Sequence, residues 1–236
     1  MLTHAYRKGF DVIEIKGIDK EGLSELRQLI EKTMLGFEIV KSFKNEAVME
    51  NISEPHHQKF ETIMSKIFDN IKETFEIIVD EAKNNKFANF QEIESIKNQQ
   101  DRFILFCRRI ISRQKIESAE TNWELLTFLT HIQHSIYYLY EYLNKNKIKI
   151  SKETKEKLNQ LNDYFNLYYK AYSEKNLQYI NTINNQKNKY QFGECLKLIE
   201  KSKGKETVVA SYIREIFRLI QIGTSPILTE ILEKKD

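Results

Sequence analysis

The segment NFQEIESIKNQQDRFILFCRRII, residues 89–111, decides the fold of this chain. Its apolar side chains recur every three or four positions, with Gln100 in the one gap, at Ile93, Ile96, Phe103, Cys107 and Ile110. Such spacing places the apolar side chains on one stripe of a helix. We therefore predict that residues 89–111 form a helix whose stripe packs on a core.

Part of this segment occurs a second time, 87 positions further along the chain. Residues 89–99 (NFQEIESIKNQ) align with residues 176–186 (NLQYINTINNQ), and six of the eleven positions are identical. Phe103 and Tyr190 then correspond as well. A shared bias toward Ile, Asn and Gln is the alternative explanation. Because the match falls on equivalent helices of two series of three, we predict a duplicated three-helix unit.

Helical spacing extends over most of the remaining chain. The only prolines are Pro55 and Pro226, and four of the seven glycines lie at or before Gly36, so little interrupts a helix in between. Apolar spacing predicts six helices, which begin after Ser53, at Asn89, near Thr121, after Ser151, at about Asn176 (ending near Lys201) and after Gly204.

The ends of these helices carry signals of their own. Ser53, with Pro55 in the first turn, and Ser151 are suited to cap the first and fourth helices. Thr121 and Glu124 have the spacing of a capping box at the start of the third. Pro226, which closely follows a glycine, should kink or break the end of the sixth.

The first 53 residues follow a different pattern. FDVIEIKG (10–17) alternates like a strand, residues 19–35 have helical spacing, and residues 37–52 read as a hairpin that turns near Lys44 and Asn45. LTHAYRKG (2–9) has the pattern of a helix end closed by a left-handed glycine, which suggests that this helix starts before the sequence does.

The predicted fold class is therefore mainly α. Two tandem three-helix bundles, related by pseudo-symmetry, follow a small α/β subdomain. The predicted domains are residues 1–53 and residues 54–236, and the second divides into a repeat at 54–148 and a repeat at 151–236.

Composition restricts the cellular setting. Lys and Arg outnumber Asp and Glu by only three, so the net charge of +3 does not propose nucleic acid as a partner, and we expect no direct nucleic acid binding by this chain. No apolar run is long enough to span a bilayer, and the first ten residues lack the apolar stretch of a secretion signal. Cys107 and Cys195 lie inside helical patterns, which favours reduced core thiols over a disulfide. We expect a cytoplasmic protein.

Two pseudo-symmetric bundles behind an α/β unit resemble the phosphate-uptake regulator (PhoU) family. The local match is closest to the archaeal branch of that family. Residues 5–42 resemble the segment that precedes the bundles there, and IESIKNQQDRF (93–103) resembles the part of the second helix that carries the metal motif of the family. In many archaeal relatives an AbrB-type DNA-binding domain comes first. This sequence contains none, which fits a shortened relative or a chain that begins inside the longer form.

The family places pairs of acidic residues, four positions apart, on the second and third helices of each repeat. Such pairs share a helix face and can converge on a metal ion. The resemblance assigns these positions to Lys97 and Asp101, His134 and Tyr138, Asn184 and Asn188, and Arg214 and Arg218. Only one of the eight is an acid, and fixed cations beside the site would repel a metal. We predict no metal site and no cofactor, and an ion pair between Lys97 and Asp101.

Other polar groups have structural interpretations that we favour over functional ones. His131 and His134 have HxxH spacing without a third ligand, and EPHH (54–57) lies where a helix begins. The six lysines within residues 145–157 fit a solvated connector. The same interpretation applies to a basic cluster formed by Arg108, Arg109, Arg113 and Lys115.

A set of tyrosines is best explained by core and rim packing: Tyr137, Tyr138, Tyr140, Tyr142, Tyr164, Tyr168, Tyr169 and Tyr172. The sequence contains no glycine-rich phosphate loop, no HExxH motif and no nucleophile elbow. We therefore expect neither an enzyme nor a catalytic residue.

The resemblance implies a regulatory adaptor that modulates phosphate transport or phosphate signalling through protein contacts. The implied partners are the ATPase subunit of a phosphate ABC transporter or a signalling protein, and a homodimer is compatible with the pattern. Two alternatives stay open. One is the sensor and dimerisation part of a transcription regulator whose DNA-binding domain lies upstream. The other is a metal-binding helical bundle.

Overall fold

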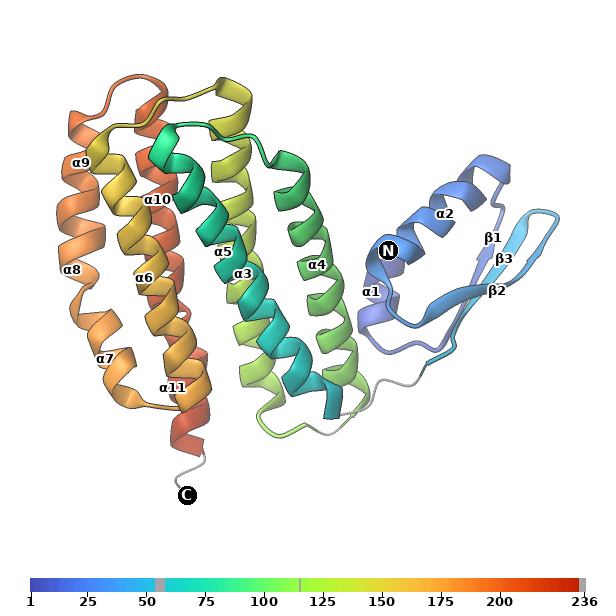
Figure 1. Ribbon diagram of the computed structural model, residues 1–236. Helices are drawn as coiled ribbons and strands as arrows, with labels where there is room; N and C mark the ends of the chain where they lie inside the picture. Colours follow the sequence, from blue (N-terminus) through green and yellow to red (C-terminus); the bar gives the residue numbers. More distant parts are fainter. Residues whose placement is uncertain (54–57, 115, 234–236) are drawn as a thin grey trace. The chain divides into compact units, whose positions relative to one another are not determined.

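The computed structural model describes residues 1–53, 58–114 and 116–233 (Figure 1). The chain is mainly helical and carries one small three-stranded sheet. It divides into two compact units, which we call unit 1 (Met1–Ile67 with Asn98–Ala119) and unit 2 (Phe68–Lys97 with Glu120–Asp236). Both α3 (Gln58–Asn84) and α4 (Phe90–Arg113) contribute residues to each unit. The predicted domain bounds at residues 53 and 54 stay a prediction.

Unit 1 contains the sheet. Its strands are β1 (Val12–Lys16), β2 (Phe37–Phe43) and β3 (Glu46–Asn51), all antiparallel, in the order β1-β3-β2. The turn of the β2–β3 hairpin has Lys44 in the left-handed region, with φ +51°. A bulge interrupts β2 between Ile39 and Lys41. The predicted strand and hairpin are both confirmed.

The helices of unit 1 also follow the sequence pattern. In α1 (Leu2–Arg7), the chain leaves the helix at Gly9, whose φ is +91°, as predicted. In α2 (Lys20–Thr33), the Asp19 side chain accepts a hydrogen bond from the Gly22 N–H at 2.8 Å and caps the first turn. The apolar face of α2 is buried and packs against β2.

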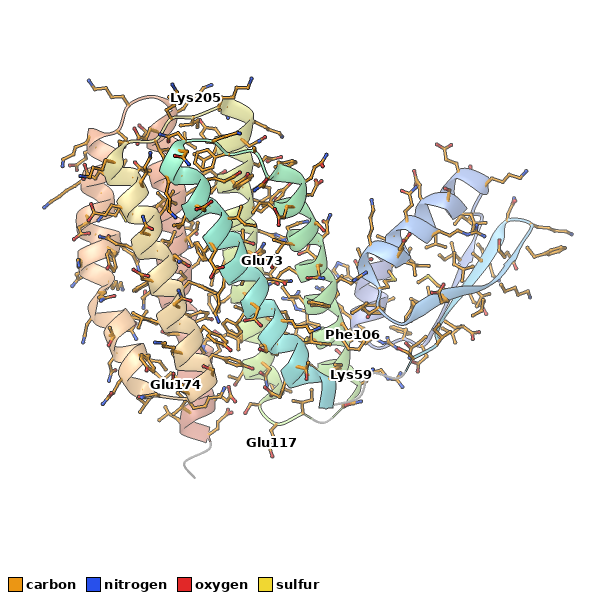
Figure 2. The ribbon with its side chains drawn as sticks, in the orientation of Figure 1. Lys59, Glu73, Phe106, Glu117, Glu174 and Lys205 are labelled. Carbon is orange, nitrogen blue, oxygen red and sulfur yellow. The ribbon has the colours of Figure 1, made fainter. Side chains whose placement is uncertain are left out.

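Unit 2 is built from helices alone in the part of the chain that the structure describes. Besides its share of α3 and α4, it contains α5 (Ala119–Asn146), α6 (Lys152–Glu174), α7 (Leu177–Asn185), α8 (Lys187–Lys189), a π-helix (Tyr190–Glu194), α9 (Cys195–Lys201), α10 (Lys205–Ile222) and α11 (Thr224–Glu233). Aromatic and aliphatic side chains fill the space between these helices (Figure 2).

Three predictions about helix ends are confirmed. The Ser151 side chain accepts a hydrogen bond from the Thr154 N–H at 3.2 Å and caps α6. The helix after Gly204 begins at the next residue, and the chain breaks at Gly223 before α11, which has Pro226 in its first turn. The predicted cap at Ser53 and Pro55 concerns the start of α3, where residues 54–57 lie outside the described part.

One prediction about helix ends is wrong. Thr121 lies inside α5 and does not cap it, because α5 already begins at Ala119, directly after Ser118, which is in the left-handed region with φ +53°. The fifth helix has the predicted bounds, because Asn176 caps α7 and α9 ends at Lys201. Between these ends it is interrupted at Gln186 and passes through α8 and the π-helix before α9.

Tyrosines supply much of the core of unit 2, as the sequence predicts. Tyr140, Tyr164, Tyr168 and Tyr172 are buried, whereas Tyr138 is exposed. A buried hydroxyl needs a hydrogen-bond partner. Tyr164 donates to the Ile183 carbonyl at 2.7 Å, and Tyr168 donates to the Gly223 carbonyl at 3.0 Å. These bonds tie α6 to α7 and to the end of α10.

Candidate protein-binding groove

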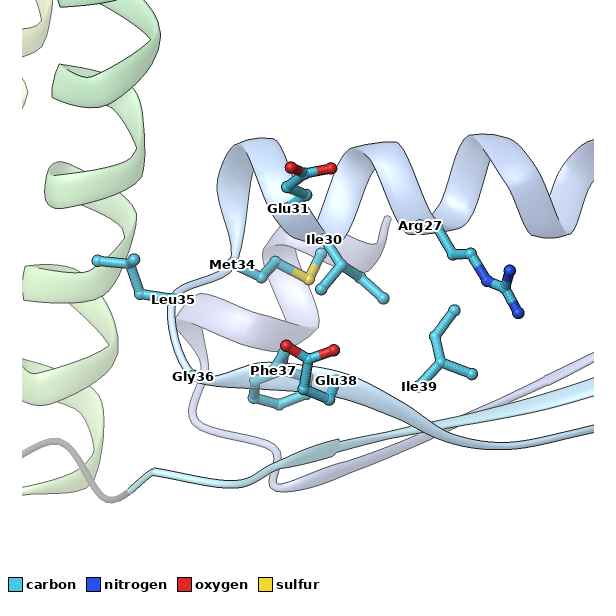
Figure 3. Close-up of a pocket in the computed structure, with 9 residues that line it drawn as sticks. All are labelled: Arg27, Ile30, Glu31, Met34, Leu35, Gly36, Phe37, Glu38 and Ile39. Carbon is cyan, nitrogen blue, oxygen red and sulfur yellow. The ribbon is translucent and has the colours of Figure 1, made fainter.

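A groove of about 660 Å³ lies between α2 and β2 in unit 1 (Figure 3). It is lined by Arg27, Ile30, Glu31, Met34, Leu35, Gly36, Phe37, Glu38 and Ile39. Ile30, Met34 and Phe37 are buried and form an apolar floor, whereas the three charged lining residues are exposed. The groove therefore offers apolar contact along its base and charge along its rim.

The end of the groove depends on a glycine. Gly36 has φ +82°, which places it in the left-handed region between α2 and β2. A Cβ atom at this position would lie 2.6 Å from the Ser53 Oγ. The Gly36 carbonyl accepts a hydrogen bond from the Ile52 N–H at 2.7 Å. Gly36 thus lets the chain turn sharply into β2 and start the ladder with β3.

Arg109 of α4 supports the floor of the groove from beneath. Its side chain is fully buried. One terminal nitrogen donates to the carbonyls of Tyr6 (2.9 Å) and Phe10 (2.8 Å), and the other donates to Asp11 Oδ1 at 2.7 Å. The guanidinium carbon also lies 5.2 Å from the ring centroid of Tyr6 and 5.0 Å from that of Phe37. A buried cation is stable only when it is paired and hydrogen-bonded in this way.

Tyr6 connects Arg109 to two residues that line the groove. Its hydroxyl donates to the Leu35 carbonyl at 2.9 Å, and its ring meets the Phe37 ring edge to face at 5.2 Å. Burial raises the pKa of Tyr6 well above its ordinary value, so the hydroxyl stays protonated as the donor. Arg109 and Tyr6 together fix Leu35 and Phe37, at one end of the groove.

The prediction of a solvated basic cluster on α4 is therefore wrong for Arg109. Arg113 is not free either, because it donates to the Gly9 carbonyl at 2.9 Å and pairs with Asp11. Lys115 lies outside the described residues. A signal was present in the sequence, since Arg102, Phe106, Arg109 and Arg113 fall three or four positions apart, and all three of these arginines bond to residues before position 32.

The positions assigned to the metal motif now carry other interactions. On α4 and α5, the Lys97 ammonium lies 5.9 Å from the Tyr137 ring centroid, and the His134 ring contacts Tyr138. On α7, the Asn184 side-chain oxygen accepts a hydrogen bond from Gln221 at 2.7 Å. The ion pair between Lys97 and Asp101 stays a prediction.

The two arginines of α10 that fall on these positions bind protein groups. Arg214 Nε donates to the Gln191 carbonyl in the π-helix at 2.9 Å. Arg218 forms two hydrogen bonds with Glu215, at 2.9 and 2.8 Å, which lower the pKa of that carboxyl. Among the described residues no group of three His, Cys, Asp or Glu side chains is arranged to hold a metal ion.

The other polar groups singled out in the sequence are the histidines and the lysine connector. His131 is exposed and His134 is partly buried, and the EPHH segment lies outside the described residues. The lysine connector is only partly solvated. Lys157 is buried and donates to Glu194 at 2.5 Å and to Gln160 at 2.8 Å, so this end of the connector is part of the packed structure of unit 2.

Both cysteines are buried free thiols, as the sequence predicts. We expect a thiol reagent such as Ellman's to leave both unmodified at pH 8 in the folded chain and to modify both after denaturation. Burial raises the pKa of Cys195 from 9.0 to about 11 and raises that of Cys107 further. The reactive thiolate of Cys195 is then about one part in a thousand at pH 8. Rapid modification of the native chain would contradict this burial.

The same shift predicts a pH dependence of stability. Because folding favours the neutral thiol, the contribution of Cys195 is complete below a pH of about 9 and is lost as the pH rises toward 11. A Cys195→Ala variant should therefore lose less unfolding free energy over this pH range than the parent chain, as measured by urea titration.

The fold and the groove together define a class: a mainly helical protein with a small α/β unit that carries an open groove. Comparison of the chain with protein-family models, with curated proteins and with solved structures finds no match in any of the three. Within the described ranges, no helix is both long and apolar enough to cross a membrane.

Proposed function

We propose that the chain is a regulatory adaptor of the phosphate-uptake regulator type, which modulates phosphate transport or phosphate signalling through protein contacts. The helix order supports this proposal. Three long helices of 27, 24 and 28 residues (α3, α4 and α5) are followed by a helix of 23 residues (α6), an interrupted helix over residues 177–201, and the pair α10 and α11. This is the order expected of two three-helix repeats.

The observation that carries the proposal is the match between the repeat and burial. Ile93 and Ile180 are both buried, as are Ile96 and Ile183, and the partners are 87 positions apart in each pair. After the π-helix the spacing changes. Cys107 and Cys195 are both buried, 88 positions apart, and so are Ile110 and Leu198.

The π-helix explains this change of one residue. A single π-turn accommodates one additional residue inside an α-helix. The π-helix lies at Tyr190–Glu194, between the part that matches at 87 and the part that matches at 88. An inserted residue at this point would keep both flanking stripes on the core. The buried cysteines then occupy equivalent positions in the two repeats, which strengthens the case for a duplicated unit.

An adaptor of this kind needs no chemistry of its own. A partner is regulated when the adaptor binds one of its conformations better than the other. Asn184, Arg214 and Arg218 fall on positions that carry acids in the family, and here they are hydrogen-bonded to neighbouring side chains and a carbonyl. We therefore propose a mechanism that does not use metal. The partners that we propose are the ATPase subunit of a phosphate transporter or a signalling protein that reports phosphate status.

Deletion of the gene in its native host tests this function. Uptake of labelled phosphate should become insensitive to phosphate supply, with uptake in replete cells rising several-fold, and a plasmid copy should restore the response. Cross-linked capture from replete and starved cells should recover the transporter ATPase subunit or a signalling protein in one state more than in the other. Unchanged uptake in both media would contradict the proposal.

A further inference from the structure

We propose that the groove between α2 and β2 binds an extended segment of a partner protein, which adds to the sheet as a fourth strand antiparallel to β2. The segment carries an acidic residue two positions before a basic residue. This inference rests on the proposed function only in treating the chain as an adaptor. It depends on three features of unit 1: the open edge of β2, the charges on the groove rim, and the spacing between those charges.

The edge of β2 has main-chain groups that point away from the sheet. In β3, the Asn51 N–H bonds to Asp11 on the β1 side, and the next N–H, of Ile52, bonds to Gly36 on the β2 side. Main-chain groups alternate along an antiparallel strand. Glu50 therefore turns its groups toward Glu38, its partner in β2. The main-chain groups of Phe37 and Ile39, on either side of Glu38, therefore point away from β3, toward the open edge of the sheet.

These outward groups can receive one short strand. The Phe37 N–H already bonds to the Met34 carbonyl at 3.3 Å, which leaves the Phe37 carbonyl and both groups of Ile39. The bulge after Ile39 ends the regular edge, because bulges twist a strand away from further pairing. An added strand would pair at Phe37 and Ile39. Strand addition of this kind obtains affinity from main-chain bonds and specificity from alternate side chains.

The rim charges specify which side chains fit. Arg27 lies above Ile39, and Glu31 lies toward the Gly36 end (Figure 3). Glu38 adds a second carboxylate near that end. None of the three charged side chains forms an ion pair with another described residue, and all three are exposed. The groove is thus acidic near Gly36 and basic near Ile39.

The spacing of these charges matches an extended strand. Side chains four positions apart on a helix, such as Arg27 and Glu31, are about 6 Å apart. Alternate side chains of a strand are about 6.6 Å apart. A strand antiparallel to β2 runs from the Ile39 end to the Gly36 end. Its acidic residue therefore comes first, opposite Arg27, and its basic residue comes two positions later, opposite Glu31.

Peptide binding tests the order of charges. The probe is a fluorescent peptide of sequence Thr-Val-Glu-Val-Lys-Val-Thr, and its control is the same peptide with Glu and Lys exchanged. Fluorescence anisotropy with the full chain should show binding of the probe and affinity about tenfold lower for the control, which corresponds to the loss of two ion contacts. Equal binding of the two peptides would overturn the proposal.

N-methylation tests the main-chain pairing. Residues directly opposite Phe37 and Ile39 are the Lys and Glu of the probe, and their N–H groups point toward β2. Methylation of the Lys nitrogen should abolish binding, whereas methylation of the central Val nitrogen should retain it. Equal effects of the two methyl groups would mean that the peptide does not add as a strand.

A charge exchange in the protein completes the test. The double variant Arg27→Glu with Glu31→Arg should prefer the reversed peptide, and both sites are exposed enough to tolerate the change. Glu14→Lys, at an exposed site on β1, is the matched control and should leave the preference unaltered. Affinity weaker than about 1 mM for every peptide would overturn the groove proposal alone. A dimer of the free chain that the probe fails to dissociate would also overturn the groove proposal. Neither result would bear on the proposed function, which the phosphate-uptake experiment tests separately.

Discussion

Replacing Arg109 by leucine should destabilise unit 1 by about 3 kcal/mol. The variant removes the donors to Tyr6, Phe10 and Asp11 and leaves two carbonyls without their partner. Asp11 is 47% exposed and can be solvated again, which keeps the loss below that of a fully buried pair. The groove should lose its shape in the same variant, since Tyr6 would no longer hold Leu35 and Phe37.

Hydrogen exchange measures this effect in unit 1 itself. Amides of residues 6–43 should lose protection in the Arg109→Leu chain. Arg109→Lys should recover little, because a single ammonium cannot reproduce the fork of donors. Lys20→Leu is the control, as it removes a positive charge from an exposed site in α2 and should change protection little. Normal protection of β2 in Arg109→Leu would show that Arg109 does not support the groove.

The local parts of this fold could be predicted from sequence. Patterns that extend over a few residues predict the β2–β3 hairpin and α2, because alternation, a turn and a cap act over short distances. The stripe from Ile93 to Ile110 is equally local. Its members Ile93, Ile96, Cys107 and Ile110 are buried as predicted, whereas Phe103 is only partly buried.

Arg109 could not be predicted in the same way. Its helical spacing with Arg102 and Arg113 places the three arginines on one face of α4, but this spacing does not show what covers that face or that Arg109 is fully buried. Its three partners lie about a hundred residues earlier in the chain, so only the fold brings them together. The groove could not be predicted for the same reason. Its two walls belong to different elements, and side chains of α1 and α4 support its floor.

The π-helix could be predicted only in part. Nothing in the residues YQFGE (190–194) themselves specifies the hydrogen bonds of a π-helix, which join residues five positions apart. The change of repeat spacing from 87 to 88 positions is nevertheless visible in the sequence when Cys107 is aligned with Cys195. Packing accounts for the tolerance of the extra residue. In the proposed duplication the stripe is restored on both sides of the extra residue. We infer that the extra length turns Phe192 outward, since its ring is 54% exposed.

Replacing Phe68 by alanine should destabilise unit 2 by about 3–5 kcal/mol. The side chain is fully buried, and four rings from α6 surround it. The Tyr172 ring stacks on it at 4.7 Å, and the rings of Tyr169, Tyr168 and Phe165 lie at 5.3, 5.8 and 6.1 Å. Removing the ring leaves a cavity that these large, rigid neighbours cannot fill.

The single tryptophan makes this measurement specific to unit 2, where Trp123 lies. Its fluorescence during urea titration should show the loss as a lower midpoint with an unchanged slope. Phe192→Ala is the matched control, because it makes the same substitution at the exposed ring of the π-helix and should cost less than about 0.5 kcal/mol. Losses of similar size at the two sites would mean that Phe192 is packed in solution, and the outward turn inferred from the extra residue would then be wrong.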